Sequence, residues 1–382
     1  MLDTFQTIDL AFAKNFIIIA ILSVYFSDGI SKFFLIFFKY DLPLSKIIKS
    51  ILLGGLVYWL IRQKQFFPII LLIMYSIGQY FIKESFSFDS LIIFSKYLFT
   101  ASFLIYFTTS NIPESTSKRY IQVFELILLI NSVLIVVGWI FSISFLRTYA
   151  GHRFGFNGLF LNSATGTYVY IIALFYYLVK YKKGFFLNPY SWLILFCCAL
   201  LGTKAALLGA VIAITGYVFY FLVGRQRLIA IITGIVLSSG LFYYMFYYAK
   251  LFNSIRLNDG LLTAIFSFRN EHLQELTIPY ISDYWGIINF LFGGVNDFST
   301  RAQFGFLDEL YFFGIIGGLY YLIIQYRAVK NIVNIKLFKY LLFGLCIVIL
   351  LAGNFFPYPS IIVYALGLIY IMKLEEHKPS IQ

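Results

Sequence analysis

The chain has 382 residues, of which 61% are hydrophobic, 21% aromatic and only 12% charged, whereas a soluble domain carries about twice that share of charge. This composition excludes an ordinary soluble domain and indicates a polytopic membrane protein. The net charge of +12 does not predict nucleic-acid binding, because Lys and Arg come in small clusters between apolar segments, as in the cytoplasmic loops of membrane proteins.

Twelve apolar segments are interpreted as membrane crossings, each of which needs about 20 apolar residues. They cover residues 10–26, 45–61, 66–82, 90–109, 121–143, 163–179, 190–203, 205–223, 228–249, 306–326, 338–353 and 359–373. The N-terminus has no basic region before the first segment, so no cleavable signal is expected. The chain is predicted to be one all-α membrane domain over residues 1–382, a polytopic bundle of about twelve transmembrane helices.

The basic connections predict how this bundle is oriented. Most of them fall on one side if the N-terminus is cytoplasmic, so both termini are predicted to be cytoplasmic. The connection 26–49 is the exception, because its four lysines lie on the nominal outer side: Lys32, Lys39, Lys46 and Lys49. We expect an interfacial helix there, with lysines that extend to the membrane surface.

The outer connection 144–162 carries the first candidate site residues, which are Arg147, Arg153 and Asn157. Arg153 opens a run Arg-Phe-Gly-Phe-Asn-Gly, whose glycines permit positive φ and a close approach of the backbone to a ligand. An ordinary interfacial turn is the alternative. Farther along, Lys204 lies at the outer end of its apolar segment, where it either pairs with Glu125 or contacts a phosphate.

Residues 250–305 are the longest polar segment and are predicted to form one large exterior loop that contains short helices. Arg269 lies at a predicted helix start capped by Ser267 or Asn270, and Arg301 lies near the end of the loop. Arginines on the outer side oppose the orientation rule, whereas a guanidinium suits phosphate. The sequence therefore predicts a phosphate or pyrophosphate site, with a solvated amphipathic helix around Arg269 as the alternative.

Asp308 and Glu309 open the apolar segment that follows the large loop. Carboxylates at such a position are costly unless they are paired, hydrated or functional. The alternative is a favourable interaction with the helix macrodipole in the first turn. Both acids are therefore candidates for catalysis.

The sequence predicts no metal site and no cofactor. The three histidines, His152, His272 and His377, are not spaced as zinc ligands are. His272 lies beside Arg269 in the large loop and is a candidate for substrate contact, with a surface histidine as the alternative.

The order of these motifs resembles the O-antigen polymerase and O-antigen ligase superfamily, membrane glycosyltransferases that act on undecaprenyl-pyrophosphate-linked glycans. The resemblance covers about residues 145–320 and is carried by Arg153 to Gly158 with Asn162, Leu201 to Leu208, Ser267-Phe268-Arg269 with Gly293-Gly294, and Asp308 to Gly317. Lys204 stands where the family has Arg. No histidine lies between Leu273 and Leu374, where the ligases have one, so the polymerase branch is favoured.

The resemblance implies a GT-C-like bundle that works at the outer face of a bacterial inner membrane. A hydroxyl of one lipid-linked repeat would attack the anomeric carbon of another glycan and release undecaprenyl pyrophosphate. Arg153 and Arg269 would hold the pyrophosphate in place of a metal, and Asp308 or Glu309 would orient or deprotonate the acceptor. The weaker candidates for substrate binding are Lys204, Arg301, Asn157, Arg147 and His272.

The expected partners are a lipid-linked glycan donor and acceptor, membrane lipid and a chain-length regulator. Three alternatives stay open. One is a ligase that transfers glycan to lipid A–core, and another is a structural subunit of an assembly complex. The third is a transporter of the lipid-linked sugar, which predicts internal repeats, discontinuous helices and ionisable residues at mid-membrane.

Overall fold

The computed structural model describes residues 2–110, 112–149, 153–330 and 335–376, and within them the chain is helical and forms no β-strand. The predicted all-α class is thus confirmed, and each of the twelve predicted apolar segments overlaps a helix, although some, such as 121–143 and 190–203, run past the ends of theirs. These helices are α1 (Leu2–Phe37), α2 (Leu44–Arg62), α3 (Phe67–Phe81), α4 (Phe88–Thr109), α5 (Glu114–Ile140), α6 (Ser163–Tyr181), α7 (Pro189–Leu200), α8 (Lys204–Phe221), α9 (Gly224–Tyr243), α15 (Gly305–Lys330), α16 (Lys336–Ala352) and α17 (Ser360–Glu376).

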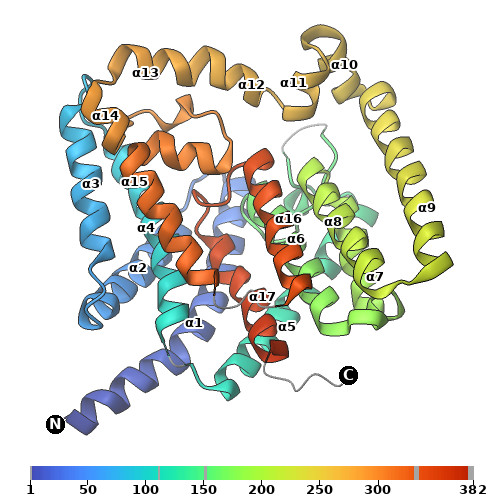
Figure 1. The fold of residues 1–382 in the computed structure, drawn as a ribbon, viewed down its shortest axis with the longest axis horizontal. Helices are drawn as coiled ribbons and strands as arrows, with labels where there is room; N and C mark the ends of the chain where they lie inside the picture. The colour runs from blue at the N-terminus through green and yellow to red at the C-terminus, as the bar shows by residue number, and fades with distance from the viewer. Residues whose placement is uncertain (1, 111, 150–152, 331–334, 377–382) are drawn as a thin grey trace.

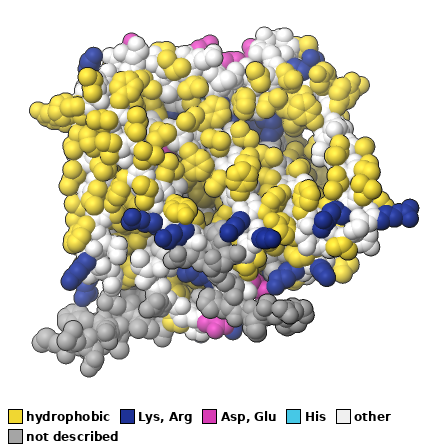
Figure 2. Space-filling view, viewed as in Figure 1, with side chains coloured by type: hydrophobic (Ala, Val, Ile, Leu, Met, Phe, Trp, Pro, Cys, Tyr) yellow, Lys and Arg dark blue, Asp and Glu magenta, His cyan; other side chains and the backbone are white. Residues whose placement is uncertain are grey.

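Seven helices in the described chain are long and apolar enough to cross a membrane alone. An eighth crossing results if the pair Ser163–Leu187 and Pro189–Leu200, bent by 103°, is one broken span. Figure 2 shows hydrophobic side chains over most of one face, with a row of Lys and Arg side chains along its lower part. Such a row is typical of a membrane boundary. The chain is therefore a membrane protein with several spans.

The first helix differs from the prediction. Its membrane-length portion is Asn15–Phe37 rather than 10–26, so Lys32 lies inside a helix of the bundle. Lys32 is 3% exposed and donates to Asn157 Oδ1 and to Gly158 O, both at 2.6 Å. The expectation that Lys32 extends to the membrane surface is wrong, because polar acceptors inside the protein solvate its ammonium.

Helix α6 is the centre of the bundle. Every residue from Thr165 to Val179 is buried, and the helix packs against α17, α7 and α8. A helix that is apolar on all sides and covered on all sides cannot shift easily. The position of its first residue, Ser163, is therefore fixed by the core.

The predicted large loop is a chain of short helices laid across one end of the bundle (Figure 1). They are α10 (Lys250–Asp259), α11 (Leu261–Phe266), α12 (Arg269–Glu271), η4 (His272–Thr277), α13 (Ile278–Tyr284), α14 (Ile287–Phe292) and η5 (Phe298–Thr300). The helix η3 (Tyr244–Tyr248) continues α9 just before them. Helix α14 packs against α3 and α15, which closes the chain of helices onto the bundle. Helices α1 and α17 begin and end, respectively, near the opposite end (Figure 1).

Helix α15 is interrupted at Gly314, whose backbone is not helical (φ 69°, ψ −175°). A Cβ built at Gly314 would lie 2.3 Å from the backbone nitrogen of Gly293. The turn between α14 and η5 thus fills the break in α15, and only glycine allows this approach. Asp308 and Glu309 lie in the part of α15 before the break, beneath the large loop.

Candidate functional site

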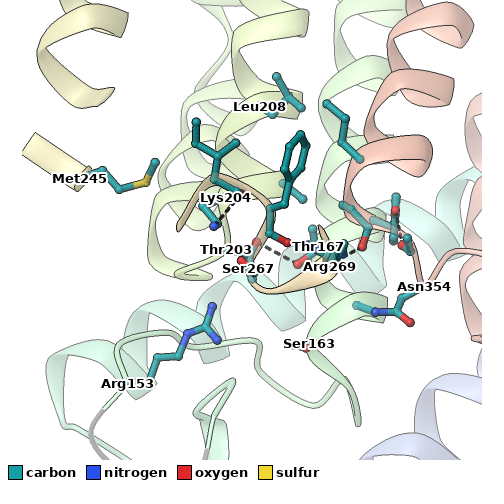
Figure 3. A pocket seen from close by; sticks show the side chains of 18 of the residues that line it. Arg153, Ser163, Thr167, Thr203, Lys204, Leu208, Met245, Ser267, Arg269 and Asn354 are labelled. Atoms are coloured by element: carbon teal, nitrogen blue, oxygen red, sulfur yellow. Dashed lines mark hydrogen bonds between the residues drawn. The ribbon is translucent and has the colours of Figure 1, made fainter. Parts of the chain in front are cut away.

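A pocket of about 390 Å³ lies beneath the large loop, and it brings together Arg153, Lys204 and Arg269, three cations from three separate motifs (Figure 3). We call it the basic pocket. Its other polar side chains are those of Tyr149, Ser163, Thr167, Tyr168, Thr203, Ser267 and Asn354. Within the described residues its lining has no Asp, Glu or His, so the charge of its side chains is positive only.

Arg269 is held by three backbone carbonyls from three different segments. Its Nε donates to Gln303 O at 3.0 Å, its Nη1 to Phe266 O at 2.9 Å and its Nη2 to Ala352 O at 2.8 Å. A guanidinium has five N–H groups, so two remain for a ligand. Burial lowers the pKa of Arg269 from its usual value, but a guanidinium stays protonated in proteins.

The backbone around Arg269 is strained. Of the eight non-glycine residues with positive φ in the described chain, four surround this side chain: Ser267 (φ 54°), Phe268 (φ 66°), Gln303 (φ 62°) and Asn354 (φ 60°). Each costs on the order of 1–3 kcal/mol, and such residues cluster at functional sites. The predicted cap of this helix start is wrong, because Ser267 is left-handed and Asn270 donates instead to Thr263 Oγ1.

Lys204 is the first residue of α8 and lines the basic pocket together with Arg269. We call the three backbone carbonyls that bind Arg269 its carbonyl cage. Its Nζ donates to Ala264 O at 2.5 Å and to Ile265 O at 2.9 Å, and it lies 4.6 Å from the ring centroid of Phe252. Of the two alternatives drawn from the sequence, pairing with Glu125 is wrong, since Glu125 binds Lys180. In the described chain Lys204 has no carboxylate partner.

Arg153 stacks on a tyrosine at the mouth of the basic pocket. Its guanidinium carbon lies 3.8 Å from the ring centroid of Tyr149, and burial raises the pKa of Tyr149. The ring fixes the plane of the guanidinium without using its N–H groups. Within the described residues no hydrogen bond uses the donors of Arg153, so they remain available to a ligand.

The glycines of the Arg153 motif dock on the turn between α7 and α8. Phe156 N donates to Leu200 O at 2.8 Å. A Cβ at Gly202 would lie 2.2 Å from Phe154 O, and Gly202 has a φ of 68°. This backbone contact joins the segment that carries Arg153 to the turn that carries Lys204.

The substitution Gly202→Ala is expected to separate these two cations. An alanine at this position has to keep the left-handed backbone conformation of Gly202, which costs about 1–2 kcal/mol. Its Cβ also displaces the Phe154 carbonyl. We expect the thermal unfolding temperature in detergent to fall and binding of pyrophosphate to weaken. Gly234→Ala is the control, because a Cβ at Gly234 in α9 meets nothing within 4 Å; equal effects of both changes would contradict the docking role of Gly202.

Two long helices begin at the basic pocket. Ser163 and Ala164 open α6, and Lys204 and Ala205 open α8. No side chain caps the start of α6. Free N–H groups and the positive end of a helix dipole favour an anion, so the backbone adds to the effect of the three cations.

Arg301 and Asp308 lie behind the basic pocket rather than in its lining. Arg301 Nε is 3.4 Å from Asp308 Oδ2, and the two side chains are 14% and 1% exposed. Arg301 Nη2 donates to Asn354 Oδ1 at 2.6 Å, and Asn354 lines the pocket. The pair therefore reaches the pocket through Asn354.

Four other predicted residues lie apart from the basic pocket. Glu309 is fully buried and accepts from Gln325 at 2.7 Å. Asn157 binds Lys32 and the Phe160 carbonyl inside the bundle. Neither Arg147 nor His272 is among the lining residues; Arg147 forms an isolated bridge with Phe156. His152 and His377 lie outside the described residues.

The apolar wall and Asn354 are the parts of the site that the sequence did not reveal. Leu208, Phe242, Met245 and Phe246 line one side of the basic pocket (Figure 3), but in the sequence they are ordinary members of apolar segments. Asn354 follows Gly353 between two apolar segments. A polar turn is ordinary at such a position, so the sequence gives no reason to single it out. In the described residues no group of three His, Cys, Asp or Glu side chains is placed to hold a metal ion.

The chain was compared with known protein families, with curated proteins and with solved structures, and none of the three comparisons finds a match.

Proposed function

We propose that this protein is a metal-independent membrane glycosyltransferase that polymerises undecaprenyl-pyrophosphate-linked repeat units into O-antigen or a related surface polysaccharide. The observation that carries the proposal is the basic pocket, in which Arg153, Lys204 and Arg269 face one cavity that no carboxylate lines. A pyrophosphate has several negative charges and many acceptor oxygens. Three cations and two helix starts supply the matching charge and donors.

The apolar wall supports a lipid as the bearer of this pyrophosphate. Leu208 of α8 and the residues Phe242 and Met245 near the end of α9 all line the pocket, and α9 has no buried residue. It stands at the edge of the bundle (Figure 1). A gap between α8 and α9 that opens to the membrane would admit a polyprenyl chain while its headgroup stays among the cations.

The proposed reaction requires stabilisation of its leaving group, the lipid pyrophosphate. An acceptor hydroxyl forms a bond to the anomeric carbon of the donor sugar and gives up its proton. The bond from that carbon to the pyrophosphate oxygen breaks, and the electron pair leaves with the pyrophosphate, whose oxygens take up the proton. Charge on this oxygen grows in the transition state, so fixed donors lower the barrier. Arg269 suits this task, because its carbonyl cage holds two N–H groups in place before substrate arrives.

We propose the topology that the sequence predicts, with twelve spans and both termini cytoplasmic. The large loop and the basic pocket then lie at the outer face of a bacterial inner membrane. The row of Lys and Arg side chains at the end opposite the large loop supports this orientation (Figure 2). With this orientation the basic pocket would lie at the outer face, where a lipid-linked glycan that has crossed the membrane is found.

A transporter of the same lipid is the second candidate, favoured by the break in α15 at Gly314, since discontinuous helices are common in transporters. The glycosyltransferase is preferred because the cations of the basic pocket gather beneath the large loop at one end of the bundle. A transporter needs its binding groups near the membrane midplane. The ligase alternative shares the pocket and differs only in the acceptor.

The substitution Lys204→Ala is expected to stop chain growth without unfolding the protein. Purified protein in liposomes would be given lipid-linked repeat units, and the products would be separated on a gel. Wild type should produce a ladder of glycan lengths, and the variant should be slower by about 100-fold, the usual effect of losing one preorganised donor to a developing anion. Lys118→Ala is the matched control, because Lys118 is exposed and pairs with Glu114 in its own helix.

The products distinguish the candidates. A ladder that Lys204→Ala removes and Lys118→Ala preserves supports the polymerase. Transfer to an added lipid A–core acceptor without a ladder would move the protein to the ligase branch. Movement of the lipid-linked sugar across the bilayer with no new glycosidic bond would overturn the glycosyltransferase and leave the transporter.

A further inference from the structure

A second cavity, of about 250 Å³, lies between α2, α4 and the connection from α16 to α17, and Lys46, Lys49 and Lys96 line it. We call it the lysine pocket. Within the described residues no carboxylate is part of its lining. Three ammonium groups from two helices around one cavity repel one another unless anions lie close by.

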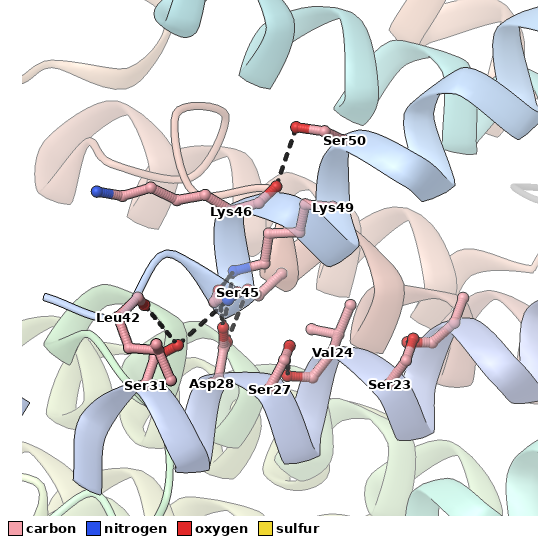
Figure 4. Close-up of polar contacts among 12 residues, drawn as sticks. Ser23, Val24, Ser27, Asp28, Ser31, Leu42, Ser45, Lys46, Lys49 and Ser50 are labelled. Carbon is pink, nitrogen blue, oxygen red and sulfur yellow. Dashed lines mark hydrogen bonds and ion pairs between the residues drawn. The ribbon is translucent and has the colours of Figure 1, made fainter. Parts of the chain in front are cut away.

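Two of these lysines have carboxylate partners outside the lining. Lys46 Nζ lies 2.7 Å from Asp41 in an exposed pair. Lys49 Nζ lies 2.8 Å from Asp28 Oδ1 (Figure 4), and Asp28 also accepts from Ser45 and, through Oδ2, from Ser360. Asp28 thus has its full set of partners, and its charge is already used to fix Lys49.

The third lysine has no such partner. Lys96 makes no hydrogen bond or ion pair through its ammonium to any described residue, although it is only partly exposed. The two other cations of the lysine pocket, Lys46 and Lys49, offer Lys96 no counter-charge. An ammonium in such a position carries a charge that an external anion would satisfy.

The remaining lining residues suit the headgroup of a lipid. The side chains of Asn162 and Tyr358 make no hydrogen bond to a described residue and so are free to bind a ligand. Leu53, Ile92 and Phe99 form the apolar part, and Ile92 is 38% exposed. Polar groups at one end and an apolar opening at the other match an amphipathic molecule.

The lysine pocket and the basic pocket are lined by successive residues of the same two segments. Leu161 and Asn162 line the first, and the next two residues along the chain line the second. Likewise the segment 357–360 borders the lysine pocket, while Gly353 and Asn354 border the basic pocket. Arg301 contacts the basic pocket through Asn354.

We propose that the lysine pocket is a second anion site, which binds the phosphate or pyrophosphate group of a second substrate molecule. This inference rests on the proposed function. In that reaction each of the two lipid-linked substrates has its own pyrophosphate; one leaves, and the other stays attached to its glycan throughout. The two adjacent pockets give one site to each, and Lys96 is the group that pairs with the pyrophosphate that stays.

The test measures binding rather than polymerisation, so that it is independent of the enzymatic assay. Full-length protein in nanodiscs would be titrated with farnesyl pyrophosphate, a short isoprenoid pyrophosphate, and in parallel with inorganic pyrophosphate. Wild type should bind two molecules of the lipid probe. Lys96→Ala and Lys96→Glu should each leave one, and Lys204→Ala should weaken the other. Lys118→Ala is the surface control, and thermal unfolding should show that both Lys96 variants are folded, because no partner of Lys96 is lost.

Each outcome decides the inference. If Lys96→Glu binds two molecules as tightly as wild type, or if wild type binds only one, the second site does not exist. If inorganic pyrophosphate occupies the Lys96-dependent site as tightly as the lipid probe does, the site recognises the anion alone and the apolar opening is not part of it. Two-site binding that Lys96→Ala reduces to one, in a protein that forms no glycan ladder, would sustain the anion site and overturn the polymerase instead.

Discussion

Arg269→Lys is expected to reduce glycosyl transfer by at least about 100-fold, even though it preserves the positive charge. Arg269 donates to three carbonyls from three segments of the chain, and one ammonium cannot reach all of them in a planar arrangement. At least one carbonyl of the cage loses its partner, which costs about 1–3 kcal/mol. An ammonium has three donors, so once two of them bind the other carbonyls only one is left for a pyrophosphate, whereas Arg269 has two.

The measurement is the rate of ladder formation together with the thermal unfolding temperature, and Arg119→Lys is the matched control. Arg119 is exposed in the first turns of α5, whose last residue, Ile140, precedes the segment that carries Arg153. Arg119 and Ile140 are 21 positions apart, which corresponds to about 32 Å of helix. This control therefore changes the same chemical group far from the pocket. An Arg269→Lys variant with full activity would show that the site needs only charge, and the carbonyl cage would then have no catalytic meaning.

The helices and the three cations of the basic pocket could be predicted from the sequence for different reasons. Apolar length alone predicts a helix in a membrane, and each of the twelve segments is helical. Arg153 and Arg269 were candidates because arginines on the outer side oppose the orientation rule, and Lys204 because it lies at the outer end of its segment. Only the family resemblance implied that they act on one pyrophosphate; the residues alone do not predict it, because their meeting depends on how the Gly155 segment docks against Gly202.

The acids and the lysines were harder to place, because a charge in an apolar chain has several ways to be satisfied. Glu309 was a candidate beside Asp308, yet the helix turns it away toward Gln325. Lys32 was expected at the membrane surface and is instead solvated by Asn157. Lys96 stands out in the sequence only as an ionisable residue in an apolar segment, which does not show whether a carboxylate lies beside it.

Asp308→Asn is expected to lower the free energy of unfolding by about 3 kcal/mol, whereas Glu309→Gln should cost much less. Asp308 is 1% exposed and is the ion-pair partner of Arg301, so the amide leaves a buried guanidinium uncompensated. Glu309 has no ion-pair partner among the described residues and keeps an acceptor for Gln325 as a glutamine. The two adjacent substitutions make the same chemical change, and unfolding in detergent compares them directly.

The double variant Asp308→Asn with Arg301→Gln separates a positioning role from a role in the chemistry. If Asp308 acts by holding Arg301, and Arg301 by holding Asn354 at 2.6 Å, then removing both charges should restore much of the lost stability. The double variant should also be no less active than the worse single one, because the residues act as a unit. A stable Asp308→Asn variant whose kcat collapses while KM is unchanged would contradict this. It would mean that the carboxylate reaches the acceptor hydroxyl itself, by a movement of the Arg301 side chain that opens the basic pocket toward α15.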